Sequence, residues 1–350
     1  MSKFCIFCGN KPNQKNKEHV IPQWLSKHTG RFNKVCEFGE AITKAQITFG
    51  ALTFPACTAC NDAFGKLEAA VKPILLDLMD SKPVNAEQIS LLMDWFDKIR
   101  VGLWLSELTL AKKVDAVAPK FHINDRVGQK DRMLIIERFP DIGEGLAFAG
   151  TNSPLFVESP SVFALIVNDF VFINASEYGL VSNKLGFPQY HKMKLSNNRN
   201  AQSLEITKGR NKTTHPVVAD YQVSPTRTII YQPMFRGVPN FATSTEFNTP
   251  YVHEHALNYD YGIGGVFVQR GDNQIKYMGA NQTMALAPRG KKPEEIGKTL
   301  QEVFKLQNFV LSSRTDIDSH SRPTSAFWRS LMAQNELLMH AYKDMGVKQK

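Results

Sequence analysis

The chain has 350 residues, of which 43% are hydrophobic and 21% are charged, and it carries a formal net charge of +9. This is the composition of a globular protein with room for two domains, and the basic excess fits either a polyanionic partner or simply a basic protein. No stretch approaches the roughly 18 apolar residues of a membrane span, and the first residues lack the charged start and apolar run of a signal peptide, so we expect a cytoplasmic protein with no membrane partner.

Four of the five cysteines form two pairs at the spacing of metal-binding knuckles. Cys5 and Cys8 make the first C-x-x-C motif, and Cys57 and Cys60 make the second. In a reducing compartment such pairs hold a metal more often than they form disulfides. Four thiolates in tetrahedral geometry make a closed site, so the sequence predicts a structural Zn²⁺ bound by all four. Cys36 has no partner at this spacing, and we interpret it as a buried or incidental thiol.

The first part of the chain, up to about residue 70, is dense in polar residues and short loops. Residues 10–17 form a polar loop, and the pattern over 19–25 then passes from a strand into a short helix. A second helix is expected to begin at Asn61, with Asn61 or Asp62 as its cap, and Pro73 can bend it.

A longer helix is expected after a break at residues 81–84. Asn85 can cap this helix, and apolar residues at helical spacing carry it to about Leu110. We expect its aromatic residues to belong to the core rather than to stack on a ligand.

Beyond about residue 115 the pattern becomes strand-rich. Strands are expected at 133–139 and 145–150, and hairpins at 163–173 and 265–278. The first hairpin turns at Asn168-Asp169, two residue types that tolerate positive φ. Two helices, at about 293–311 and 324–345, close the chain.

These elements predict an α+β protein in three parts. They are a small cysteine-containing domain over 1–75, a helical connector over 76–115, and a sheet-rich α+β domain of unknown fold over 116–350, with a substrate-selecting or regulatory role.

One segment of the last part, 181–240, is strongly basic, with nine lysines and arginines against two acidic residues. Aromatic residues are interleaved with the basic ones. Such a run can follow a phosphate backbone and stack bases, or it can be a solvated loop region. The candidates for nucleic-acid binding are Lys184, Lys192, Lys194, Arg199, Lys208, Arg210 and Lys212.

A carboxylate and a histidine lie between the two cysteine pairs, in the run Glu18-His19-Val20-Ile21-Pro22. Hydrolysis of a phosphodiester needs a base for the attacking water and a divalent cation at the scissile phosphate. The imidazole of His19 suits the first task, and oxygen ligands from Glu18 and Asn61 would suit Mg²⁺. Taken alone, His19 could equally brace the fold, but its place between the cysteine pairs favours a catalytic role.

Together, Cys-x-x-Cys, Glu-His-Val-Ile-Pro and Cys-x-x-Cys-Asn resemble the HNH endonuclease superfamily, over about residues 1–75. The resemblance implies a zinc-braced, treble-clef-like ββα-metal fold. It also implies His19 as the general base, with Glu18, where aspartate is commoner, and Asn61 on a catalytic Mg²⁺ or Mn²⁺. Glu68, two helical turns after Asn61, is a further candidate for this metal.

The chain departs from the family in two respects. The usual lysine three residues after Asn61 is missing, because Phe64 stands there, and Lys66 and Glu68 are nearby substitutes. The central asparagine, expected a few residues before the second cysteine pair, has no counterpart, because residues 51–55 read Ala-Leu-Thr-Phe-Pro. In the family pattern that asparagine orients the backbone around the histidine, so its loss is either compensated or marks reduced activity.

The leading hypothesis is therefore a metal-dependent endonuclease, with DNA as the expected substrate in preference to RNA. One alternative is a zinc-stabilised module that binds nucleic acid or protein and whose HNH-like centre has decayed. Another, which comes from the resemblance alone, is an effector subunit of a prokaryotic antiviral defence system that stays silent until a partner or signal engages the C-terminal domain.

Overall fold

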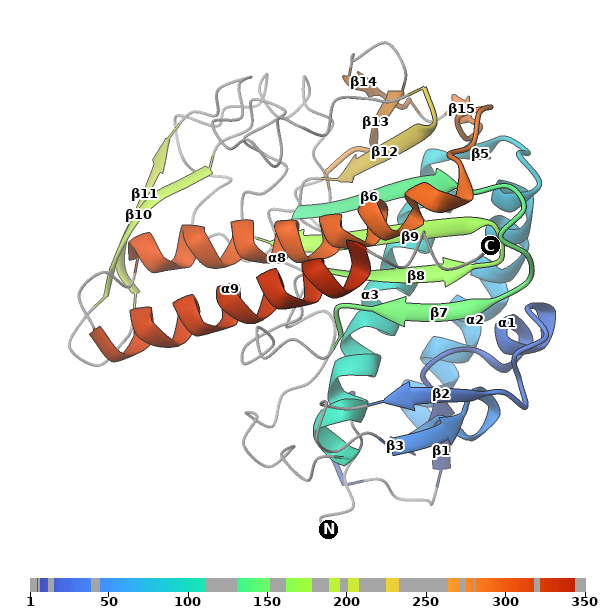
Figure 1. Ribbon diagram of the computed structural model, residues 1–350, viewed down its shortest axis with the longest axis horizontal. Helices are drawn as coiled ribbons and strands as arrows, with labels where there is room; N and C mark the ends of the chain where they lie inside the picture. The colour runs from blue at the N-terminus through green and yellow to red at the C-terminus, as the bar shows by residue number, and fades with distance from the viewer. Residues whose placement is uncertain are drawn as a thin grey trace.

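The computed structural model describes residues 5, 7–11, 16–38, 45–110, 131–151, 162–177, 189–195, 201–207, 225–232, 264–270, 275–279, 281–317 and 322–343. Over these residues the chain is a mixed α+β protein, as expected from the sequence, with five α-helices and a seven-stranded antiparallel sheet. Figure 1 shows the N-terminal elements gathered at one side of this sheet.

The region of the cysteine pairs is built on a two-stranded ladder followed by a helix. Strand β1 (Asn16–His19) pairs antiparallel with β4 (Thr53–Ala56), so that His19 lies opposite Thr53. Helix α2 (Thr58–Met79) follows β4 directly. Between the two strands lie four short elements: α1 (Gln23–His28), β2 (Val35–Phe38), β3 (Ala45–Thr48) and the 3-10 helix η1 (Phe49–Ala51).

Helix α2 begins at Thr58 rather than at the predicted Asn61, so neither Asn61 nor Asp62 is its cap. The N-cap is Cys57, whose Sγ accepts a hydrogen bond from Cys60 N (3.4 Å). Oxygen side chains usually fill this role, and a sequence pattern based on them therefore placed the start too late.

Helix α3 (Ala86–Leu110) is the long helix predicted from the apolar spacing. It follows a turn in which Ser81 has a φ of 60° and a short strand, β5 (Val84–Asn85). Asn85 Oδ1 accepts from Gln88 N (2.9 Å), and Gln88 Oε1 accepts from Asn85 N (2.8 Å). The predicted cap is confirmed, in the reciprocal form of a capping box.

The large sheet is antiparallel, in the order β14-β13-β12-β6-β9-β8-β7. Its strands in chain order are β6 (Asp131–Arg138), β7 (Leu146–Ala149), β8 (Val162–Val167), β9 (Phe170–Glu177), β12 (Arg227–Gln232), β13 (Phe267–Arg270) and β14 (Ile275–Tyr277). The hairpins β8–β9 and β13–β14 are the predicted ones, and Asn168 in the first turn has a φ of 50°. Two separate ladders join β10 (Gln189–Leu195) to β11 (Ala201–Thr207) and β15 (Thr283–Met284) to β5.

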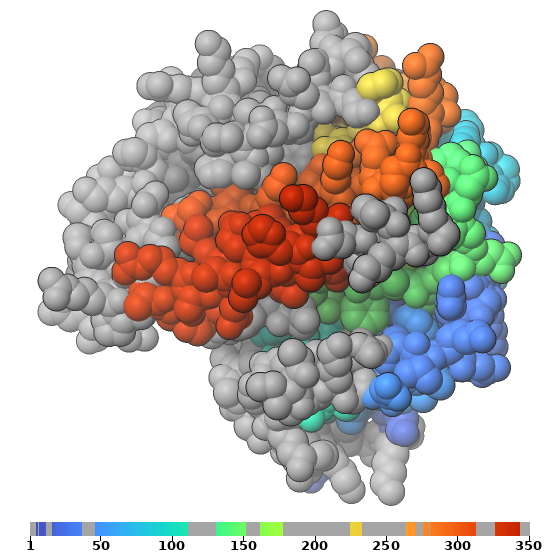
Figure 2. All heavy atoms as spheres, in the orientation of Figure 1, coloured from blue at the N-terminus to red at the C-terminus, as the bar shows by residue number. Residues whose placement is uncertain are grey.

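The sheet is covered by helices on both faces (Figure 1). Leu134 and Ile136 of β6 belong to the apolar core that contains α3, whereas Met133 and Ile135 belong to the core that contains α8. This alternation follows from the two-residue period of a strand. The face of the sheet opposite α3 is covered by α8 (Ile296–Ile317), which follows the short 3-10 helix η5 (Pro293–Glu295), and by α9 (Arg322–Lys343). Figure 2 shows α8 and α9 on the surface of the molecule.

A single apolar core joins the cysteine region to the sheet. It contains Phe7 beside the first cysteine pair, Val20 after His19, Trp95 of α3 and Phe172 of β9. Side chains thus pack continuously across the expected domain boundaries near residues 75 and 115, and those boundaries stay predictions. No helix in the described part of the chain has the length and apolar character needed to cross a bilayer.

Helix α3 also carries charged side chains into its interface with the sheet. Arg100 donates to Asp97 Oδ1 (2.6 Å) and to Asn174 Oδ1 of β9 (2.5 Å). Arg132 of β6 donates to Asp97 Oδ2 (3.2 Å) and to Gln232 Oε1 (2.6 Å). Burial raises the pKa of Asp97 although both guanidinium groups oppose the rise. Because an unpaired charge would be expensive here, we infer that this network fixes the rotation and depth of α3 on the sheet.

The close approach of α3 to the cysteine region can be tested with two helical glycines. A Cβ added at Gly102 of α3 would lie 2.9 Å from Val20 Cγ1, whereas a Cβ at Gly65 of α2 would meet nothing within 4 Å. We expect Gly65→Ala to raise the free energy of unfolding by about 0.5–1 kcal/mol through helix propensity. Gly102→Ala should lower it by about 1–2 kcal/mol, because α3 has to move away from Val20. Urea unfolding measures both, and equal stabilisation would contradict the tight contact.

Candidate functional site

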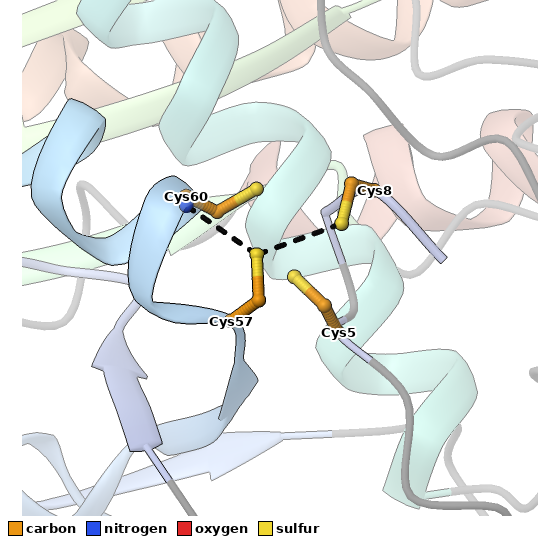
Figure 3. A group of neighbouring side chains, drawn as sticks. All are labelled: Cys5, Cys8, Cys57 and Cys60. Carbon is orange, nitrogen blue, oxygen red and sulfur yellow. Dashed lines mark hydrogen bonds between the residues drawn. The ribbon is translucent and has the colours of Figure 1, made fainter. Parts of the chain in front are cut away.

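The four paired cysteines converge on one point. Their Sγ atoms all lie within 4.8 Å of one another, and the sulfurs of Cys8 and Cys57 are 3.7 Å apart. Figure 3 shows Cys57 and Cys60 at the start of α2, facing Cys5 and Cys8 of the first knuckle. A zinc ion with Zn–S bonds of about 2.3 Å needs sulfurs about 3.8 Å apart, so this group fits a metal such as zinc.

The protonation of these thiols is unequal. A hydrogen bond with Cys60 lowers the pKa of Cys5, and the same contact raises the pKa of Cys60. Burial raises the pKa of Cys8. Several thiolates this close together require a compensating positive charge, and a bound Zn²⁺ would supply it.

Cys36 lies apart from this group, in the β2–β3 ladder. Its Sγ donates to Ile47 O (3.2 Å), and burial raises its pKa to about 11. It is a half-buried protonated thiol, in keeping with the interpretation from the sequence.

His19 ends β1, and its ring is held through Nε2. Gly50 O lies 3.2 Å from this nitrogen and Gln23 Nε2 lies 3.0 Å from it. The two contacts require opposite tautomers, because Nε2 donates to Gly50 O only when protonated and accepts from the Gln23 amide only when not. In the first tautomer the lone pair is on Nδ1.

The carbonyl oxygen of Gly50 can lie against the His19 ring because residue 50 has no side chain. A Cβ at this position would lie 2.7 Å from the ring of Phe32, and Gly50 N donates to Phe32 O (2.8 Å). The insertion between β1 and β4 thus brings a backbone carbonyl to the histidine. This role of Gly50 could not be predicted, because no pattern in the chain indicates which carbonyl will lie opposite a ring.

Glu18 and Asn61, the two expected ligands of a catalytic cation, are in contact, and the cation itself stays a prediction. With its nitrogen toward the carboxylate, the Asn61 amide donates to Glu18 Oε2 (2.5 Å) and to Lys17 O (3.2 Å). With the amide turned over, three oxygens face one another, and a cation between them would be needed to stabilise the arrangement. The orientation of this amide therefore distinguishes a hydrogen-bonded site from a cation site.

The other carboxylate oxygen of Glu18 faces a residue that the sequence analysis did not consider. Lys98 of α3 is fully buried, and its Nζ donates to Glu18 Oε1 (2.9 Å) and to Glu68 Oε1 (2.7 Å). Nζ also donates to two backbone carbonyls, His19 O (2.9 Å) and Val20 O (3.1 Å). Glu68, expected as a third cation ligand, thus binds an ammonium group in this structure, and its role toward a metal stays a prediction.

A signal for Lys98 exists in the sequence. It stands inside the run Trp95-Phe-Asp-Lys-Ile-Arg-Val-Gly-Leu-Trp-Leu105, where the helix is apolar on most sides. Lysine is almost never fully buried without a partner, so its presence there indicates a buried acceptor. Nothing in the sequence indicates that this acceptor is Glu18, some 80 residues earlier.

The side chains predicted to contact nucleic acid lie outside those that the structure describes. Lys192 and Lys194 lie on β10, whose side chains are not described. The other five, Lys184, Arg199, Lys208, Arg210 and Lys212, lie outside the described residues.

Comparisons of the chain with protein-family models, with curated proteins and with solved structures found no match.

The four-cysteine site predicts a specific metal content. We expect about one zinc per chain in the purified protein, and a zinc content near zero in Cys8→Ser, which removes one of four ligands without touching the cap of α2. Cys36→Ser is the matched control and should keep its zinc, because Cys36 lies outside the group. Elemental analysis measures both variants, and full zinc in Cys8→Ser would contradict the site.

Proposed function

We propose that the chain is a metal-dependent endonuclease of the HNH type, which hydrolyses phosphodiester bonds in nucleic acid, with DNA preferred. The observation that carries the proposal is the contact between Glu18, which precedes His19 on β1, and Asn61, which follows Cys60 of the four-cysteine group on α2. The order of β1, β4 and α2, strand, strand and helix, supports a zinc-braced ββα-metal fold for this region.

His19 is the general base in this proposal. In the tautomer that this role needs, Nε2–H donates to Gly50 O, which holds the ring and leaves the lone pair on Nδ1. Nδ1 makes no hydrogen bond with the described residues and can take a proton from the attacking water. A neutral imidazole near pH 7 is the form this step requires.

Glu18 and Asn61 would hold the catalytic Mg²⁺ or Mn²⁺. Glu18 Oε2, the Asn61 amide oxygen and Lys17 O are hard oxygen ligands, so the donor set fits such an ion when the amide is turned with its oxygen toward Glu18. The bound ion would neutralise charge at the scissile phosphate. A site with this few protein ligands leaves positions for water and phosphate oxygens.

A second candidate is a zinc-stabilised module that binds nucleic acid without cutting it, or an effector that needs a partner. The contact between Lys98 and Glu18 favours it, because the carboxylate already has a cationic partner within the protein. Salt-dependent nucleic-acid binding without cleavage in Mg²⁺ or Mn²⁺ would support the module. Cleavage that begins only after a partner is added would support the effector.

The test is cleavage of plasmid DNA and of labelled DNA and RNA oligonucleotides, with Mg²⁺, Mn²⁺ or EDTA. We expect cleavage only with a divalent cation, and a rate roughly 10²–10⁴ lower in His19→Ala, the usual contribution of a general base.

The matched control is His28→Ala. His28 is exposed in the last turn of α1, and its loss should leave cleavage unchanged. Undiminished cutting by His19→Ala would remove His19 as the base.

A further inference from the structure

Lys98 is the fully buried cation of the candidate site. Its side chain is 0% exposed, and it comes from α3, whereas its partners lie on β1, on the bend after β1 and on α2. Its Nζ also lies 5.6 Å from the ring centroid of Phe64. Burying an ammonium group is costly unless its donors are satisfied, and here four oxygens lie within 3.1 Å of Nζ.

The two carbonyl contacts determine how the chain leaves β1. In an extended strand successive carbonyls point in opposite directions, yet His19 O and Val20 O both accept from the same ammonium. The backbone must therefore bend around Lys98 at the residue that follows the histidine. This bend sets the direction in which β1 ends and so the place of the His19 ring.

The carboxylate contacts orient Glu18. Because Oε1 is bound to Lys98, the other oxygen, Oε2, is turned toward the Asn61 amide. Glu68, on α2, binds the same Lys98 ammonium, so one internal cation balances the two carboxylates. Glu18 can then offer a single oxygen to a divalent ion.

Helix α3 holds Lys98 rigidly. Asp97 and Arg100, on either side of it in sequence, are fixed in the buried network with the sheet. Gly102, one turn further, lets the helix lie against Val20. The backbone of Lys98 is therefore fixed relative to the sheet, and its ammonium contacts the bend and Glu18 from this fixed helix.

We propose that Lys98 is a positioning residue for the HNH-like centre: it holds the His19–Val20 bend and limits Glu18 to one oxygen for the metal. This inference rests on the proposed function. Lys98 acts through His19 and Glu18 and touches neither the phosphate nor the metal.

The test compares Lys98→Met with Lys98→Gln. Methionine has neither charge nor donor, whereas glutamine keeps N–H donors for the two carbonyls but has no charge. Lys98→Met should cleave about 100-fold more slowly, because the base is displaced, yet bind Mn²⁺ about tenfold more tightly, because Glu18 and Glu68 lose a neighbouring positive charge. Lys98→Gln should share the tighter Mn²⁺ binding and recover much of the rate. If Lys98 only stabilised the fold, its replacement would lower the cleavage rate and the Mn²⁺ affinity together.

Two measurements are independent of cleavage. Mn²⁺ binding to the zinc-loaded protein is followed by electron paramagnetic resonance, and the ring nitrogens of ¹⁵N-labelled histidine report the His19 hydrogen bond without Mn²⁺. We expect the His19 signals to shift in Lys98→Met and to stay near wild type in Lys98→Gln. Unchanged His19 signals together with unchanged Mn²⁺ affinity in Lys98→Met would overturn the proposal.

Two controls separate the possible failures. If Lys98→Met does not fold, the double variant Lys98→Met/Glu68→Gln removes one of the uncompensated carboxylates and is measured in its place, with the same expected His19 shift. If the wild type cuts nothing with any divalent cation or partner, the proposed function fails, and the role of Lys98 is decided by the Mn²⁺ and ¹⁵N measurements alone.

Discussion

The burial of α3 is the constraint on which the rest of this structure depends. The helix passes between the cysteine region and the large sheet, so the charged side chains of its buried stretch, Asp97, Lys98 and Arg100, must find partners in the protein. Asp97 and Arg100 find theirs on the sheet side, and Lys98 finds its partners around His19. One helix thereby connects the candidate site to the sheet through ionic contacts that permit few alternative arrangements.

The two metals expected from the sequence have different structural support. Four sulfurs within 4.8 Å of one another form a closed group whose geometry alone fits zinc. The oxygens of Glu18, Asn61 and Lys17 could serve a hard cation only in one orientation of the Asn61 amide, and a cation at this open group stays a proposal. This difference is what chemistry requires, because a structural ion is enclosed by protein ligands, whereas a catalytic one must exchange water and substrate.

Local patterns predicted much of the fold. The cysteine spacing indicated the metal group, Asn85 the cap of α3, and Asn168-Asp169 the β8–β9 turn, because each depends on residues close together in the chain. The start of α2 was misplaced because a sulfur took the role of a capping oxygen. The partners of Glu18 and His19 were missed because Lys98 and Gly50 come from distant elements, and only packing brings them there.

The contacts around His19 bear on the absent central asparagine of the HNH pattern. The sequence left two possibilities, compensation or reduced activity. Lys98 of α3 binds the carbonyl oxygens of His19 and Val20. The carbonyl oxygen of Gly50, in η1, contacts the His19 ring. Both the backbone and the imidazole are therefore held by groups outside the usual motif. If the histidine needs only a held backbone and a held ring, these two contacts are sufficient, and the loss of the asparagine does not by itself imply an inactive centre.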